Sequence, residues 1–124
     1  MSTDGINPKD KIGSKKVDLS LIPTSALVEV ARCMENGAKK YGPFNWRNPD
    51  QKVQYMTYIS ANIRHALSFL DGENYASDSG LSHLAHACAG LMVLIDAINC
   101  GNVIDNRPIA GVTGKLLDEY IKKD

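Results

Sequence analysis

Hydrophobic side chains recur at helical spacing in three segments of the chain. Over 25–40, 50–71 and 80–99 they fall three or four residues apart. The stripes consist of Leu27, Val30, Ala31, Met34 and Ala38; Val53, Met56, Ile59, Ile63, Ala66, Leu67 and Leu70; and Leu81, Leu84, Ala85, Cys88, Leu91, Met92, Leu94, Ile95 and Ile98. Gly72 and Gly101 follow the second and third stripes, as glycine often follows a helix C-terminus. The pattern therefore predicts three long helices.

The third predicted helix is hydrophobic on nearly every side. No charged residue occurs between His86 and Asp96. Such a helix must be buried on nearly every side, and two other helices are too few to surround it. We therefore expect a second copy of the chain to cover part of 80–99.

The two ends of the chain show weaker patterns. Residues 1–22 have no sustained periodicity and predict an extended arm, which is followed by a helical core over 24–100. Residues 101–124 predict a loop and a short helix over about 115–122. The fold class is therefore all-α: three main helices, a short C-terminal helix and an N-terminal arm, completed by oligomerisation.

Composition narrows the class of protein. The 124 residues make one domain, and 14 basic and 14 acidic side chains give a formal net charge of zero. Zero charge argues against binding to DNA or to an anionic membrane. No apolar run is long enough to span a membrane. Three scattered cysteines predict buried, reduced thiols, and the cytosol is the expected location.

The loop over 41–49 holds the densest set of chemically useful side chains. Phe44 and Trp46 offer flat apolar faces, Arg47 a cation, and Asn45 both a donor and an acceptor. Stacking, charge and an amide together suit a nucleotide. The alternative interpretation is that Trp46 fills the core and Arg47 is a surface charge, and composition alone leaves both open.

Histidines and acids offer two further sites. His83 and His86 share one helix face, and His65 lies on the preceding helix, so three imidazoles could hold a metal ion. The alternative, which we favour, is that they form hydrogen bonds within the helical interior. A two-magnesium site needs paired acids on facing helices, and here the acids are scattered.

Six runs of residues occur in order between about residues 6 and 110. They are PKDKIGSKK from Pro8, the segment 29–47 with GAKKYGPFNWR, Arg64-His65, Asp71-Gly72-Glu73, DSGLSHLAHA from Asp78, and GNVIDNRP from Gly101. Together they resemble a bacteriophage family, the N-terminal domain of dATP/dGTP diphosphohydrolases. Short stand-alone members, encoded by phages or prophages, resemble the first type of anti-Thoeris signal-sequestering protein.

The resemblance implies a ligand and an assembly. The ligand is a glycocyclic ADP-ribose made by the TIR-domain enzymes of bacterial Thoeris defence, held without cleavage, and other cyclic nucleotides are further candidates. The assembly is a homo-oligomer, a dimer or a set of dimers, in the cytosol of the bacterial host. On this hypothesis the protein is not an enzyme and needs no metal or cofactor. The alternative is a metal-dependent dATP/dGTP diphosphohydrolase of the MazG-like kind, which the scattered acids disfavour.

Ten residues are the candidate ligand contacts under this hypothesis. Arginines and lysines would meet phosphates, aromatic rings would stack on the base, and amides and an imidazole would line the pocket. They are Arg47, Arg64, Arg107, Lys16 and Lys39; Phe44 and Trp46; and Asn45, Asn62 and His65.

Overall fold

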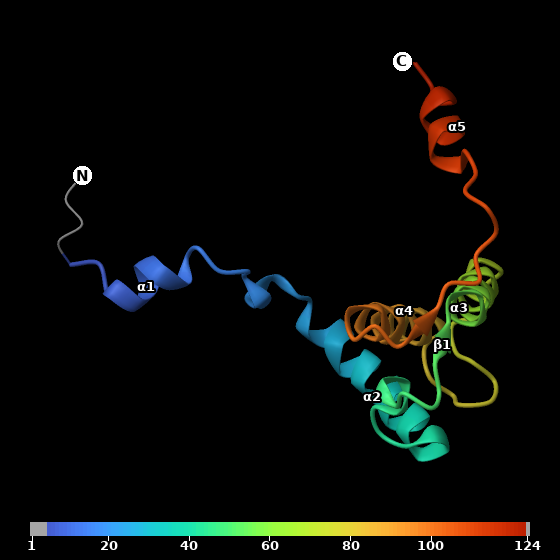
Figure 1. The fold of residues 1–124 in the computed structure, drawn as a ribbon, viewed down its shortest axis with the longest axis horizontal. Helices are drawn as coiled ribbons and strands as arrows, with labels where there is room; N and C mark the ends of the chain where they lie inside the picture. The colour runs from blue at the N-terminus through green and yellow to red at the C-terminus, as the bar shows by residue number, and fades with distance from the viewer. Residues whose placement is uncertain (1–4, 124) are drawn as a thin grey trace.

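The computed structural model describes residues 5–123, and its secondary structure is almost entirely helical. Three long helices, α2 (Thr24–Tyr41), α3 (Tyr55–Leu70) and α4 (His83–Asn99), gather into one bundle. Figure 1 shows this bundle with the N-terminal segment running away from it and α5 (Thr113–Glu119) standing apart on another side. The predicted all-α fold class is confirmed, and α2 and α4 lie close to their predicted ranges.

The helix ends follow local chemistry. Ser82 caps α4, because its hydroxyl oxygen accepts a hydrogen bond from the backbone N–H of Ala85 at 3.3 Å. Gly42 follows α2 with φ 87°, and Gly101 follows α4 with φ 71°. A side chain at either position would strain the backbone, so glycine fits these turns.

The prediction that the second helix begins near residue 50 was wrong. Residues 53–54 form β1 (Val53–Gln54), which pairs in parallel with β2 (Val103–Ile104), and α3 begins only at Tyr55. The N–H of Val53 donates to the carbonyl of Asn102 at 3.0 Å. The pairing partner lies about 50 residues away, so local periodicity carried no signal for it.

Two other expectations need correction. The arm predicted as extended over 1–22 contains α1 (Pro8–Gly13) and the 3-10 turn η1 (Leu19–Leu21), and neither has a buried residue. Asn7 caps α1 by accepting from the N–H of Lys9 at 2.8 Å, and Pro8 suits the first helical position. Residues 1–4 of the predicted arm lie outside the described part. The cysteines are free as expected, but only Cys33 is buried, whereas Cys88 and Cys100 are exposed.

The core lies between α4 and its two neighbours and is made of small side chains. One cluster joins Val30 and Cys33 of α2 to Ala85 and Ala89 of α4. A second joins Val53, Leu94 and Ala97, with Trp46 and Tyr58 packed against it. At Gly90 the helices α3 and α4 come close together, because a Cβ there would collide with the Asn62 carboxamide of α3. Small residues thus let α3 and α4 pack closely.

Large apolar side chains remain exposed on the other side of α4. Leu91, Ile95 and Ile98 are 43%, 58% and 43% exposed. The single chain therefore covers only part of the helix that the sequence predicted to be buried all round. Within the described residues, no helix combines the length and apolar character needed to cross a membrane.

Candidate functional site

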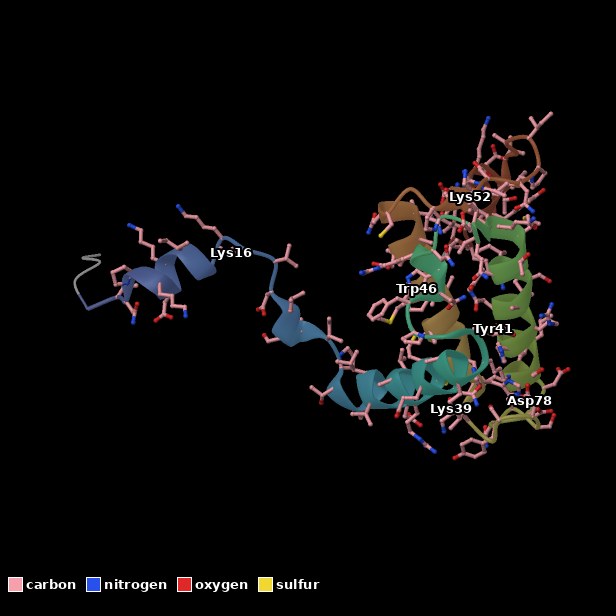
Figure 2. All side chains as sticks on the ribbon, turned by 60° about the horizontal axis from the view of Figure 1, so that its bottom comes forward. Lys16, Lys39, Tyr41, Trp46, Lys52 and Asp78 are labelled. Atoms are coloured by element: carbon pink, nitrogen blue, oxygen red, sulfur yellow. The ribbon has the colours of Figure 1, made fainter. Side chains whose placement is uncertain are left out.

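A pocket of about 840 Å³ opens between α2, the loop after it, α3 and α4. This volume lies within the range of small-molecule sites. Figure 2 labels Tyr41 and Trp46, which lie where α2 and its loop meet the other two helices. The predicted contacts that line this pocket are Phe44, Asn45, Trp46, Arg47, Asn62, Arg64 and His65.

The aromatic side of the pocket is held together by Asp96 of α4. Trp46 donates its Nε1–H to Oδ2 of Asp96 at 2.6 Å, and Arg47 donates to both carboxylate oxygens at 2.8 and 3.0 Å. The Arg47 guanidinium also lies 4.8 Å from the centre of the Phe44 ring. Hydrogen bonds from Arg47 and Trp46 lower the pKa of Asp96 to about 2. Asp96 therefore stays ionised and fixes both side chains at neutral pH.

Phe44 presents its ring in an uncommon backbone conformation. Its φ is 54°, and its ring centre lies 5.3 Å from that of Trp46 at an interplanar angle of 48°. The following 3-10 turn, η2 (Asn45–Arg47), is anchored by buried Asn102. The Asn102 amide donates to the carbonyls of Trp46 and Asn48 at 2.7 and 2.8 Å. The left-handed backbone conformation of a phenylalanine costs free energy. Such a residue beside a cleft is typical of functional loops.

Three histidines meet beside the same pocket, and two of them, His65 and His86, line it. Nδ1 of His65 lies 2.8 Å from Nδ1 of His83, and Nε2 of His83 lies 2.8 Å from Oε1 of Glu73. His86 stacks on His65 with ring centres 4.9 Å apart, and its Nε2 lies 2.7 Å from the hydroxyl of Ser79. The structure thus supports the hydrogen-bonding interpretation of these rings.

Burial keeps two of these histidines neutral. It is the main cause that lowers the pKa of His65, and it also lowers that of His86. Neighbouring histidines lower the His65 pKa further, while Asp78 opposes the change. At pH 7 both rings are therefore uncharged.

Two α3 residues complete the pocket. Asn62 is buried, and Arg64 is exposed and donates one hydrogen bond, to the Ser60 hydroxyl at 3.0 Å. Among residues 5–123, Arg64 forms no ion pair, whereas Arg47 is committed to Asp96. Arg64 is thus the better-placed cation for an anionic ligand.

Three predicted contacts lie away from the pocket within one chain. Lys16 lies in the N-terminal segment, and Lys39 is exposed on α2 outside the lining. Arg107 pairs with Asp105 at 2.8 Å and lies over the Tyr55 ring, 4.9 Å from its centre. Their roles as ligand contacts stay predictions.

Sequence reasoning missed the groups that hold the pocket in shape. Asp96 is the first charged residue after His86 in an apolar helix, and that isolation was a signal of a buried or bonded acid. Asn102 and Glu73 gave no comparable signal. Asn102 donates to the carbonyl of Trp46, which is distant in sequence, and Glu73 accepts from His83 across the α3–α4 loop.

Metal ligands do not converge in the described part of the chain. Over 5–123, no three His, Cys, Asp or Glu side chains are grouped so as to hold an ion. The pocket acids Glu35, Asp78 and Asp96 come from separate elements, and Asp96 is occupied by Arg47 and Trp46. The residues present therefore do not fit a magnesium pair.

Fold and site together define a small all-α protein with a pocket that combines aromatic rings, arginine and histidine. The family model for the dATP/dGTP diphosphohydrolase N-terminal domain matches residues 6–107, and the chain belongs to this family. A protein of Salmonella phage PMBT28, named dATP/dGTP diphosphohydrolase, is 34% identical over 97 residues. The match covers 78% of this chain but 32% of that relative. No solved structure matches the chain.

These names correct one expectation. We expected a protein that is not an enzyme, whereas the family and the phage relative both carry an enzyme name. That expectation rested on the resemblance to the signal-sequestering proteins and on the scattered acids of this chain. The match covers 32% of the relative's length, so the acids within it were a poor guide to the class.

Proposed function

We propose that the pocket between α2, α3 and α4 binds a purine nucleotide. The observation that carries this proposal is the convergence of Phe44, Trp46 and Arg64 on one cavity of nucleotide size. Aromatic faces suit the base, and an arginine without an acidic partner suits the phosphates. The residues that line it in this structure all belong to one chain.

Purine deoxynucleoside triphosphates are the first ligand class. This choice is supported by the family description and by the name of the phage relative, which both specify dATP and dGTP. We assign to this chain the nucleotide-binding part of the family's activity, since it spans 32% of the relative's length.

A glycocyclic ADP-ribose is the second candidate ligand. It carries the adenine and the two linked phosphates that the same side chains would recognise in dATP. The resemblance of the short phage members supports it, and capture of this signal would counter Thoeris defence in the bacterial cytosol.

The experiment titrates the purified protein with dATP, dGTP, dCTP and glycocyclic ADP-ribose by calorimetry. Bound material is then released by heat and identified by chromatography. The proposal expects saturable binding of at least one purine ligand and weaker binding of dCTP, and the released species shows whether the ligand was cleaved. Equal, weak responses to all four ligands would contradict it.

A further inference from the structure

One buried amide in the pocket lacks a hydrogen-bond partner. Asn62 is 8% exposed, lines the pocket, and its Nδ2 donates to no group of residues 5–123. On its other side, the carboxamide oxygen lies against Gly90 of α4. A buried N–H₂ without an acceptor is costly, so such groups normally serve a purpose. The purpose available here is a ligand acceptor in the pocket.

The hydrogen bonds of the neighbouring histidines determine which nitrogen of His65 carries hydrogen. The Glu73 carboxylate can only accept, so Nε2 of His83 is the donor at 2.8 Å. With hydrogen on Nε2 alone, His83 has an acceptor at Nδ1, and His65 then donates its own Nδ1–H across the 2.8 Å contact. Neutral His65 therefore has a lone pair at Nε2. Within the described chain no group donates to that nitrogen.

The charged and titratable residues near His65 belong to α2, α3, α4 and the loop between α3 and α4. The net result of burial and these groups is a neutral ring at pH 7. One added proton would remove the acceptor whichever ring holds the charge, because Nε2 of His65 then carries hydrogen. The groups are Lys40 of α2, Arg64 of α3, Asp78 and Glu73 of the α3–α4 loop, and His83 and His86 of α4.

We propose that Asn62 and His65 together recognise the edge of the ligand's base, Asn62 through its Nδ2–H as donor and His65 through its Nε2 as acceptor. The inference rests on the proposed nucleotide-binding function and adds its base recognition. The two residues are three positions apart on α3, so they share one helix face, and both line the pocket. Glu73 and His83 are positioning residues, since they set the hydrogen on His65.

One donor beside one acceptor can bond either purine, but through different edges. Adenine offers its N7 acceptor next to the 6-amino donor, and guanine offers its 6-oxo acceptor next to the N1–H donor in the same order, whereas N1 and the 6-amino group of adenine have the opposite order. The pair thus accounts for a single pocket that accepts a 6-amino and a 6-oxo purine. It rejects a purine with hydrogen at position 6, which lacks the second group, because a site built to bond a polar group leaves its own groups unpaired without it.

The first test reads the histidines directly and needs no ligand. Nitrogen-15 NMR at pH 7.5 should show His65 with hydrogen on Nδ1 and a bare Nε2. Glu73→Ala should redistribute hydrogen between the two nitrogens of His65, whereas Glu35→Ala, a pocket acid without a histidine contact, should leave the spectrum unchanged. Hydrogen fixed on Nε2 of His65 in the parent would overturn the inference.

The second test compares dATP, dGTP, the 6-unsubstituted purine deoxynucleoside triphosphate and inorganic tripolyphosphate. The parent should bind dATP and dGTP at least tenfold more tightly than the unsubstituted analogue, which corresponds to about 1.4 kcal/mol. His65→Ala should abolish that preference while tripolyphosphate binding stays within twofold. Asn62→Ala should weaken dATP and dGTP alike, and circular dichroism checks that both variants fold.

The outcomes separate the two proposals. Equal binding of dATP and the unsubstituted analogue by the parent would overturn base recognition while leaving the nucleotide pocket in place. Failure of the parent to bind any nucleotide would overturn the proposed function and this inference together. Affinity for dATP should also fall at a pH below the ordinary histidine value, because burial lowers the pKa of His65 and the ring takes up its proton only there, while tripolyphosphate affinity does not fall. A dATP affinity independent of pH would contradict the acceptor role.

Discussion

At the scale of single residues, Arg64 and Arg47 differ although both line the pocket. Arg47 forms an ion pair with Asp96, whereas Arg64 donates only to a serine hydroxyl. Arg64→Ala should therefore weaken dATP binding about tenfold or more, the scale for a charge-assisted contact. Calorimetry measures the change, with Arg32→Ala on the outer side of α2 as the control. Equal losses in both variants would mean that only overall charge matters.

Asp96 is the residue whose removal should disturb the aromatic side of the pocket. Asp96→Ala releases the Trp46 indole and the Arg47 guanidinium together, because both donate to that carboxylate. We expect the Trp46 indole to become more mobile, which lowers its fluorescence anisotropy. Nucleotide binding should weaken as well. Asp118→Ala, in α5, is the matched control. Unchanged anisotropy in Asp96→Ala would show that packing alone holds the ring.

The two neutral histidines make stability depend on pH. The pKa of His65 and of His86 is lower in the folded chain than the ordinary 6.5. The unfolded chain therefore takes up protons first as the pH falls through 6.5, and the free energy of unfolding decreases below that pH. Urea unfolding at pH 7.5 and 5.5 measures the loss. The double variant His65→Gln with His86→Gln should lose less between the two pH values than the parent.

At the scale of elements, the three long helices could be predicted because their apolar spacing is local information. The β1–β2 pair could not, since Val53 meets Val103 through a contact that no neighbouring residue encodes. The residues of the candidate site also fall into those that the sequence could predict and those that it could not. Phe44 and Trp46 stood out as an aromatic loop, whereas Asp96 became a site residue only when α4 was placed beside that loop.

The contact between α3 and α4 should be intolerant of volume at one position. Gly90→Ala places a methyl group against the Asn62 carboxamide and should destabilise the fold by about 1–3 kcal/mol. Gly37→Ala is the matched control: it lies within α2, has no atom within 4 Å of an added Cβ, and should gain roughly 0.5–1 kcal/mol. Chemical denaturation measures both. A neutral Gly90→Ala would show that the helices separate without cost.

At the scale of the whole molecule, α4 exposes a regular apolar stripe. Its members are Leu84, Cys88, Leu91, Ile95 and Ile98, all exposed and spaced by four, three, four and three residues. This alternation is the repeat by which two helices pack side by side. Together with the zero formal net charge, it supports the proposal that a second copy of the chain covers the stripe.

Ile95→Glu is the variant that tests this assembly. The residue lies within the stripe and is 58% exposed in the single chain, so a carboxylate there costs little in a monomer. In a helix–helix contact the same carboxylate would be desolvated without a partner, which destabilises the pair.

We expect the parent to scatter light as a dimer or larger species at micromolar concentration and Ile95→Glu to shift toward the 13.5 kDa chain. Ile109→Glu, at a residue that is 98% exposed in the loop after β2, should leave the assembly intact. A parent that is already monomeric would contradict the assembly, yet the pocket would stand, because every residue of its lining comes from one chain.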